Sequence, residues 1–253
     1  KEMQKYCKRI NLDFLVTPFS YKESDEIEKL GVKTFKVASM DLNNYAFLEH
    51  IAKKNKTIIL STGLSNLSEI DKAVRTIENT GNKKLILLHC TSIYPLQSKD
   101  VNLKRIETLK KLYPYPIGFS DHTPGFEIAL ASVALGVCLI EKHFTLDKNM
   151  SGWDHHMSTD STDMNNLVMS SKKVFSALGS NRILRVETKE RVNSFRRSIV
   201  ASKNIKKGEK FKKKNLDFKR PGTGFPPEKI NDIVGKVAKR NITFDELIKK
   251  EDF

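Results

Sequence analysis

Residues 117–145, IGFSDHTPGFEIALASVALGVCLIEKHFT, decide the fold of this chain. The stretch opens with an apolar run that ends at His122 and closes with a second run that ends at His143. Residues 126–137 between them are apolar on one face and rich in small side chains, which is typical of a helix packed on a sheet. The pattern predicts strand, helix, strand. If the two strands are parallel neighbours, both histidines lie at the carboxyl edge of one sheet.

The same alternation extends toward both ends of the chain. Apolar, β-branched runs predict six strands, at 13–16, 34–38, 57–60, 84–89, 117–119 and 138–141. Helical periodicity separates them, at 24–30, 45–54, 68–81, 103–113 and 125–135. Gly31, Gly81 and Gly136 stand where helices should end. Strands alternating with helices predict an α/β fold with a parallel sheet covered by helices.

Polar residues follow every one of these apolar runs. A doubly wound sheet concentrates such residues at one switch point, whereas a (β/α)8 TIM barrel spreads them over the carboxyl ends of all its strands. The spread favours the barrel. Six units are two short of closure, so we expect the first two βα units to be absent from this chain.

The organisation changes in the last third of the chain. A long loop is predicted at 147–158 and a further helix at 161–179, and 182–197 is a charged connector without glycine. From residue 198 the pattern turns to short strands and turns. We therefore predict a partial barrel at 1–181, a linker at 182–197 and a small, loop-rich domain at 198–253.

Composition narrows the class of protein. The 253 residues are 39% hydrophobic and 30% charged, with a net charge of +15. The lysines are widely spread and not interleaved with aromatic residues, so we expect an enzyme for anionic substrates and no nucleic-acid partner. No apolar run is long enough for a membrane span, so no membrane partner is expected. Cys90 and Cys138 lie in apolar runs and are interpreted as core residues, and the odd count of three cysteines indicates a reduced, cytoplasmic protein.

His122 and His143 are candidate ligands of one divalent metal. Two neutral imidazoles that converge in a polar pocket leave coordination positions open. The alternative is that each histidine only caps its strand through a hydrogen bond. Asp154, in the 147–158 loop, could complete or support such a site. Its neighbours His155 and His156 point apart on a regular backbone, so at least one of them should face solvent.

A second candidate feature is a phosphate cradle. The ammonium of Lys36 and several hydroxyls offer the short hydrogen bonds and positive charge that phosphate requires. Each hydroxyl has a structural alternative as a strand end or helix N-cap, but a lysine in so apolar a strand needs a partner. Glu141 shares a face with His143 and can contact substrate or pair with Lys36. The candidate hydroxyls are those of Thr17, Ser39, Ser61 and Ser120.

The strings TPFS, KVAS, ILSTG, LLHCTSIYP, GFSDHT, EKHFT and KRPGTG, in this order, resemble the sialic acid synthase family. The resemblance covers essentially the whole chain and includes a C-terminal module like type III antifreeze protein, the SAF domain. It implies a metal-dependent condensation of phosphoenolpyruvate with the open-chain aldehyde of an N-acylated amino sugar such as N-acetylmannosamine. The product is a nonulosonic acid, and phosphate is released.

The resemblance also implies roles for individual residues. His122 and His143 match the ligands of Mn²⁺ or Mg²⁺, and Tyr94 and Asp154 match substrate-side and metal-side positions. Arg220 matches an arginine that reaches the sugar from the SAF domain of a partner subunit, which implies a domain-swapped homodimer. The phosphoenolpyruvate-binding positions are matched by Thr17, Lys36, Ser39, Ser61 and Ser120.

The chain departs from the family pattern in three places. Ser92 stands where many members have asparagine, which alters one phosphate contact. The loop reads Gly-Trp-Asp-His where N-acetylneuraminate enzymes often have Gly-Pro-Asp, which leaves the sugar open. The first family strand carries a glutamate needed at the site, and that strand is expected to be missing here. We therefore expect residues 1–253 alone to be inactive.

Three alternatives stay open at this stage. The first is a sibling enzyme that acts on a 2,4-diacetamido sugar and makes legionaminate or pseudaminate. The second is a metal-dependent TIM-barrel hydrolase, which needs a nucleophilic water but no phosphate cradle. The third is a non-catalytic binding module in which the SAF domain does the binding.

Overall fold

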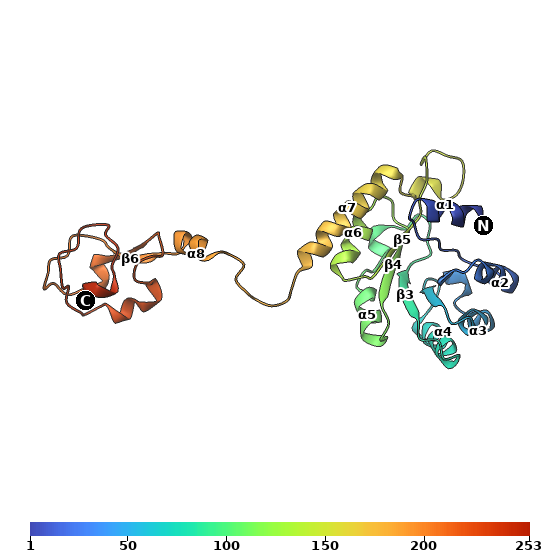
Figure 1. Ribbon diagram of the computed structural model, residues 1–253, viewed down its shortest axis with the longest axis horizontal. Helices are drawn as coiled ribbons and strands as arrows, with labels where there is room; N and C mark the ends of the chain where they lie inside the picture. The colour runs from blue at the N-terminus through green and yellow to red at the C-terminus, as the bar shows by residue number, and fades with distance from the viewer. The chain divides into compact units, whose positions relative to one another are not determined.

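The structure is a computed structural model that describes residues 1–253. The chain divides into two compact units, Lys1–Ser180 and Asn181–Phe253, which are described separately (Figure 1). None of its helices combines the length and the apolar character that a membrane crossing requires.

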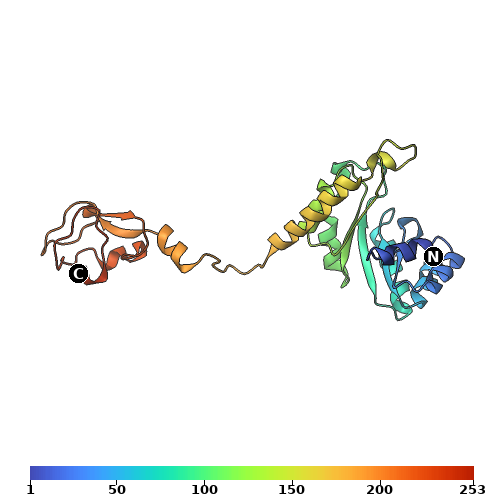
Figure 2. The same ribbon diagram turned by 45° about the horizontal axis from the view of Figure 1, so that its top comes forward.

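A five-stranded parallel sheet forms the centre of the first unit. Its strands lie in chain order, each hydrogen-bonded to the next, and the sheet curls into a half-barrel (Figures 1 and 2). The predicted α/β fold with a parallel sheet is therefore confirmed, while the number of units missing from closure stays a prediction. The strands are β1 (Thr34–Val37), β2 (Thr57–Ser61), β3 (Leu85–Cys90), β4 (Ile117–Asp121) and β5 (Ile140–Lys142).

Helices connect the strands and cover the outer side of the sheet (Figure 1). Gly31, Gly81 and Gly136 all have positive φ just past helix ends, which is the conformation that glycine adopts without strain. The helix bounds are α1 (Glu2–Arg9), α2 (Tyr21–Lys29), α3 (Tyr45–Lys53), α4 (Leu67–Asn79), α5 (Arg105–Leu112), α6 (Glu127–Ala134) and α7 (Ser161–Leu178). Short 3-10 turns follow at Ser39–Asp41, Ser98–Asp100 and His155–Met157.

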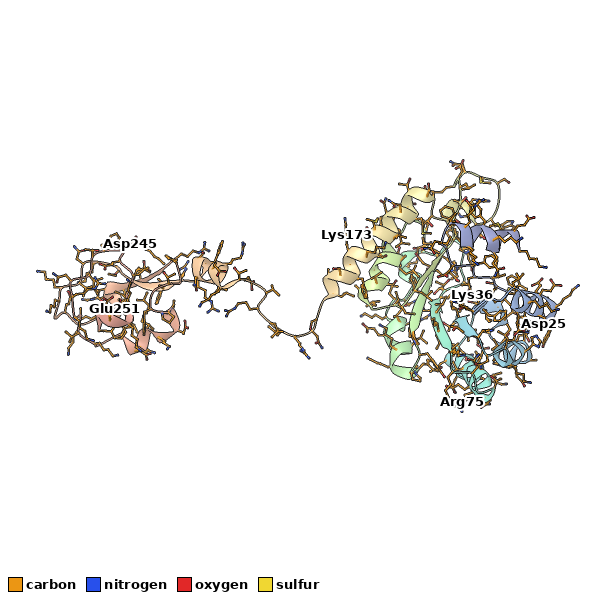
Figure 3. All side chains as sticks on the ribbon, viewed as in Figure 1. Asp25, Lys36, Arg75, Lys173, Asp245 and Glu251 are labelled. Atoms are coloured by element: carbon orange, nitrogen blue, oxygen red, sulfur yellow. The ribbon has the colours of Figure 1, made fainter.

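The two faces of the sheet differ in chemistry because side chains alternate along each strand. Phe35, Leu60, Leu87 and Phe119 are fully buried in the apolar core between sheet and helices. Lys36 lies on the other face, inside the curve of the sheet (Figure 3). The outer face therefore belongs to the apolar core, whereas the inner face combines apolar side chains such as Ile59 and Leu88 with polar groups at the carboxyl ends of the strands.

Two sequence interpretations are wrong. Residues 13–16 form no strand: the segment makes a single hydrogen bond to β1, from the Lys36 amide to the Val16 carbonyl (3.3 Å), and one bond is no ladder. Cys138 is exposed rather than buried in the core. It precedes β5, an edge strand that pairs only with β4 and is covered on one side alone.

The second unit has its own small core. Strands β6 (Ser198–Ala201) and β7 (Leu216–Lys219) pair antiparallel, and 3-10 turns at Lys213–Asn215, Pro227–Asp232 and Lys250–Asp252 complete the unit. Buried side chains such as Ile199, Phe211, Ile233 and Ile248 fill its interior. The helix α8 (Lys189–Phe195) belongs to this unit, since the Asn193 carbonyl accepts a hydrogen bond from the Gly222 amide (2.6 Å).

Candidate active site

A cavity of about 590 Å³, lined by both polar and apolar side chains, opens at the carboxyl ends of the half-barrel strands. Asp154 lies beside this cavity, close to His143, whereas Arg220 lies in the second unit. The structure thus brings ten of the twelve predicted site residues to one place. They are Thr17, Lys36, Ser39, Ser61, Ser92, Tyr94, Ser120, His122, Glu141 and His143.

Lys36 lines this cavity, and its ammonium contacts both a hydroxyl and a carboxylate group. Its ammonium donates to the Ser61 hydroxyl (2.8 Å) and the Val37 carbonyl (3.2 Å), and it lies 3.4 Å from Glu141 Oε2. Ser120 donates to the other oxygen of Glu141 (2.7 Å). The ion pair anticipated as the structural alternative is therefore present. The Lys36 side chain is only 7% exposed, but it lines the cavity, where an incoming anion would compete with Glu141 for the ammonium.

A cluster of hydroxyl and thiol groups lies next to this network. Ser39, just beyond the end of β1 as expected, accepts a hydrogen bond from the Gly63 amide (3.1 Å). The Cys90 thiol lies 3.5 Å from the Ser39 hydroxyl and 3.8 Å from the Ser92 hydroxyl. Sequence reasoning missed Gly63 and Cys90, although both stand within quoted strings. Neither glycine nor cysteine is a residue type that indicates a phosphate contact, and only the structure shows that Gly63 and Cys90 lie beside Ser39.

Gly63 leaves the space that this cluster needs. A methyl group there would stand 2.7 Å from the Ser39 hydroxyl and 3.1 Å from the Cys90 sulfur, and would also clash with the Ser92 hydroxyl.

Serine side chains can rotate away, so we expect Gly63→Ala to fold but to displace both hydroxyls from the cavity. The resemblance described above implies phosphoenolpyruvate as the substrate, so we expect its apparent KM to rise about tenfold, equivalent to ~1.4 kcal/mol. Steady-state kinetics and a thermal melt check this; an unchanged KM would exclude the cluster from phosphate binding.

The two candidate metal ligands meet at the mouth of the cavity. The ring centroids of His122 and His143 are 5.3 Å apart, and Tyr94 lies 4.3 Å from the first ring and 5.8 Å from the second. Nδ1 of His122 lies 2.9 Å from the Thr91 carbonyl, which can only accept. The proton is therefore assigned to Nδ1, so Nε2 of His122 is the nitrogen that faces the Cys90 thiol and that a ligand would have to take over from it.

Burial and neighbouring groups set different pKa values for these residues. Burial lowers the pKa of His143, and the nearby His122 lowers it further. Burial also opposes the charged form of His122, but hydrogen bonding with Cys90 and the Thr91 carbonyl outweighs it and raises the pKa of His122. In return, His122 lowers the pKa of the Cys90 thiol against the effect of burial. His143 is the imidazole held more firmly neutral.

The loop after β5 is tied back to the site. The Thr159 amide donates to the His143 carbonyl (2.9 Å), and the Thr159 hydroxyl donates to the same oxygen (2.8 Å). Asp154 Oδ2 lies 3.6 Å from His143 Nδ1, which orients the imidazole electrostatically. His155 contacts the Thr145 hydroxyl (2.7 Å), whereas His156 is exposed, so one of the two faces solvent as expected.

A buried ion pair joins the two strands that carry the histidines. Asp121 and Lys142 are partners in the β4–β5 register, with 2.8 Å between Oδ2 and Nζ, and both side chains are essentially inaccessible. Asp121 also accepts from the amide and hydroxyl of Thr123 (3.0 and 2.9 Å), and Lys142 donates to the Thr123 carbonyl (2.6 Å). The residues next in the chain, His122 and His143, are therefore fixed relative to each other.

The donor set fits a divalent cation that keeps open positions. No group of three or more His, Cys, Asp or Glu side chains forms a closed metal site in this structure. The protein offers two imidazoles: Thr91 fixes the tautomer of His122, and the Asp154 carboxylate lies 3.6 Å from His143. Such a set leaves positions for substrate oxygens, as a Lewis-acid role requires.

The fold and this cavity define a class of α/β enzyme that works at the carboxyl end of a parallel barrel-type sheet. Residues 1–182 match the family model described as NeuB family, and residues 196–253 match the SAF domain. The chain belongs to the NeuB family and is an enzyme of the NeuB type with a SAF domain.

Curated relatives and a solved structure agree with this assignment. N,N'-diacetyllegionaminic acid synthase of Campylobacter jejuni is 43% identical over 99% of this chain and 76% of its own length. Human N-acetylneuraminate-9-phosphate synthase is 35% identical over 99% of this chain and 70% of its length. The crystal structure of N-acetylneuraminic acid synthetase from Leptospira borgpetersenii superimposes with a TM-score of 0.71 at 35% identity, covering 75% of this chain and 66% of that one.

Proposed function

We propose that this protein condenses phosphoenolpyruvate with an N-acylated amino sugar to give a nonulosonic acid and inorganic phosphate. One observation carries the proposal: a buried ammonium with surrounding hydroxyls and a pair of converging imidazoles line the same cavity. The first group suits a phosphate and a carboxylate, and the second suits a metal ion that polarises an aldehyde. The family membership and the names of the relatives support the same chemistry.

The proposed reaction forms one carbon–carbon bond. C3 of phosphoenolpyruvate attacks the aldehyde carbon, whose oxygen becomes a hydroxyl, and water adds at C2 before phosphate leaves. Lys36, Ser61 and Ser120 hold the anionic groups of phosphoenolpyruvate, together with the Ser39 and Ser92 hydroxyls. His122 and His143 would hold Mn²⁺ or Mg²⁺, which when bound would supply Lewis-acid activation of the aldehyde. Tyr94, against both imidazoles, is assigned to the sugar side.

The test is phosphate release from the complete natural protein with Mn²⁺, phosphoenolpyruvate and a panel of sugars. Release should require both phosphoenolpyruvate and a sugar. Release from phosphoenolpyruvate alone, or hydrolysis of another ester, would favour the TIM-barrel hydrolase. Failure to bind either metal or phosphoenolpyruvate would favour a non-catalytic binding module.

The identity of the sugar is the open part of the proposal. N-acetylmannosamine is the first candidate, and the 2,4-diacetamido sugars that lead to legionaminate or pseudaminate are the alternative. The 43% identity to a synthase named for diacetyllegionaminic acid, against 35% to the human enzyme, supports including them in the panel. Trp153, next to Asp154 and 93% exposed, is available to contact such a substrate.

Lys36→Met keeps most of the side-chain stem and removes the charge. We expect the apparent KM for phosphoenolpyruvate to rise about a hundredfold (~2.7 kcal/mol) and that for the sugar to change little, because the ammonium faces the anion. The exposed Lys33→Met is the matched control and should leave both constants unchanged. Equal effects of Lys36→Met on both substrates would instead assign Lys36 to its ion pair with Glu141.

We also propose that Arg220 reaches the sugar across a domain-swapped homodimer. Arg220 is exposed, and its guanidinium lies over the Phe195 ring at 5.1 Å, which restricts its motion. Subunit mixing tests the proposal, with one chain carrying Arg220→Ala and the other His122→Ala. If the arginine acts in trans, each mixed dimer regains one intact site of two, and therefore about half of the wild-type activity. A sample in which only half of the dimers are mixed should show about a quarter. Mixed dimers as inactive as both parents, with exchange verified, would contradict it.

A further inference from the structure

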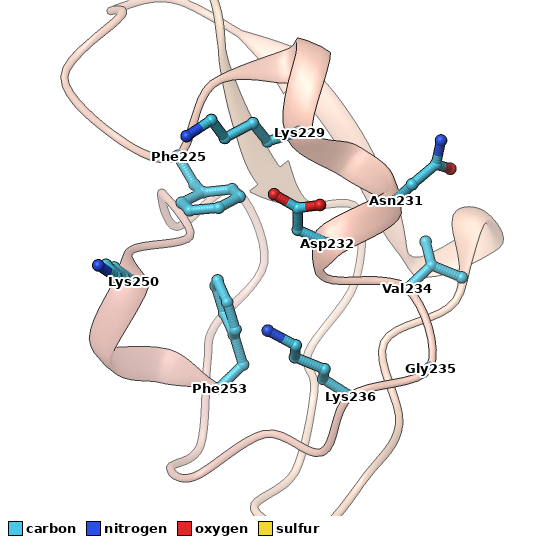
Figure 4. Close-up of a pocket in the computed structure, with 9 residues that line it drawn as sticks. All are labelled: Phe225, Lys229, Asn231, Asp232, Val234, Gly235, Lys236, Lys250 and Phe253. Atoms are coloured by element: carbon cyan, nitrogen blue, oxygen red, sulfur yellow. The ribbon is translucent and has the colours of Figure 1, made fainter.

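The second unit carries a pocket of its own, with a volume of about 510 Å³. This size falls in the range of pockets that take small organic ligands. Its walls combine two phenylalanine rings, three lysines and one aspartate (Figure 4). The lining residues are Phe225, Lys229, Asn231, Asp232, Val234, Gly235, Lys236, Lys250 and Phe253.

The two rings form a fixed apolar surface. Phe225 and Phe253 are packed edge to face, with centroids 5.0 Å apart and planes at 85°. Both are partly buried against the core of the second unit, and Phe253 also contacts the fully buried Phe211. The rings cannot turn away without disturbing that core. Their remaining exposed surface suits the C–H face of a sugar ring.

The charged side chains around the rings form no ion pair. The ion pairs of the second unit are made by Lys203, Lys219 and Arg240, not by the pocket lysines. Lys236 lies 4.6 Å above the Phe253 ring, and Figure 4 shows Lys229 and Asp232 extending toward the same space, while Asn231 points away from it. Two ammonium groups therefore flank an aromatic surface with a carboxylate between them.

The charge of the chain is concentrated in this unit. Residues 181–253 hold 21 of the 45 Lys and Arg but 10 of the 30 Asp and Glu. A surplus of this size attracts anions in general and selects none of them. Selectivity has to come from features that the other lysine-rich surfaces lack, and in this pocket those features are the rings and Asp232.

We propose that this pocket is a second, non-catalytic binding site for a small anionic sugar, either a sugar acid or a sugar phosphate. Lys229 and Lys236 would bind the carboxylate or phosphate, and Asp232 would accept hydrogen bonds from sugar hydroxyls. The same carboxylate repels a second anionic group, so the site suits one anion on one ring rather than a polyanion. The rings of Phe225 and Phe253 take the apolar face of the sugar.

The experiment is isothermal titration calorimetry on residues 1–253 with four probes. N-acetylneuraminate represents sugar acids and N-acetylglucosamine 6-phosphate represents sugar phosphates, and whichever binds more tightly identifies the anion. N-acetylmannosamine is the neutral control, and inorganic phosphate is the anion without a ring. Each probe is titrated into wild type, into Lys229→Gln/Lys236→Gln and into Lys213→Gln/Lys214→Gln. The last variant removes the same charge from an exposed turn outside the pocket.

The pocket variant should weaken binding of the anionic sugar about fivefold or more, whereas the matched control changes it less than about twofold. The neutral sugar should leave the backbone amide shifts of Gly235 and Lys236 unchanged, even if it binds in the barrel cavity as a substrate. Backbone amide shifts at Gly235 and Lys236 should move during the titration, which locates binding in the second unit even if the barrel cavity also binds the probe. Equal loss in both variants, inorganic phosphate shifting the Gly235 and Lys236 amides at as low a concentration as the sugar, or no saturable shift of these amides up to about 10 mM would overturn the proposal.

Discussion

Replacing either His122 or His143 with alanine should lower kcat/KM by about a thousandfold, equivalent to about 4 kcal/mol. The site has two imidazoles and no third side chain in position to replace one of them. Under the proposed metal role, loss of one ligand would remove most of the affinity for the divalent ion and, with it, activation of the aldehyde. No other single change to a cavity residue should have so large an effect on activity.

Mn²⁺ titration followed by electron paramagnetic resonance separates metal binding from catalysis. Wild type should bind one ion, and each single variant should bind at least tenfold more weakly. His156→Ala is the matched control because that imidazole is exposed, and it should bind Mn²⁺ like wild type. Wild-type Mn²⁺ affinity in the His122→Ala/His143→Ala double variant would show that the two histidines only cap their strands.

The protonation states of the two histidines predict how metal binding depends on pH. A metal ligand must be neutral, so protons compete with the ion. The pKa of His122 is raised and that of His143 is lowered, so His122 is the residue that protonates first as the pH falls. Mn²⁺ affinity should therefore decline as the pH drops through the pKa of His122, above the point where His143 begins to titrate.

Much of the inner face of the sheet could be predicted from strand periodicity alone. Each apolar run ends in polar residues, and a period of two places Ser120 with His122 and Glu141 with His143 on one face. The structure agrees, with Ser120 opposite Glu141 in the register of β4 and β5. The 13–16 run is also apolar but forms no ladder. Composition alone does not show whether such a run will pair with a neighbouring strand.

The groups that sequence reasoning missed act through tertiary proximity. Gly63 contributes a backbone amide that donates to Ser39, and its lack of a side chain leaves room for the neighbouring hydroxyls. The sequence shows only a glycine, which is equally compatible with the start of a helix. Cys90 fits an apolar run, and its contact with Ser39 joins residues 51 positions apart. Lys142 borders the cavity but its side chain is only 2% exposed, and only the register of β4 and β5 identifies Asp121 as its partner.

Lys142→Met should destabilise the first unit by about 3–5 kcal/mol, because it leaves the carboxylate of Asp121 buried without its cation. This is a large part of the 5–15 kcal/mol that typically stabilises a domain. Urea unfolding gives the loss directly. The exposed pair Lys53–Glu49 supplies the matched control, and Lys53→Met should cost less than about 1 kcal/mol.

The double variant Asp121→Asn/Lys142→Met distinguishes a structural pair from one that also positions the site. It removes the unpaired charge, so at least half of the lost stability should return. The two strand ends would then lack the 2.8 Å bond that fixes His122 against His143, so Mn²⁺ affinity should remain about tenfold below wild type. Recovery of both stability and metal affinity would show that the Asp121–Lys142 pair stabilises the fold but does not position the imidazoles. Recovery of stability alone would identify Asp121 and Lys142 as positioning residues for the two imidazoles.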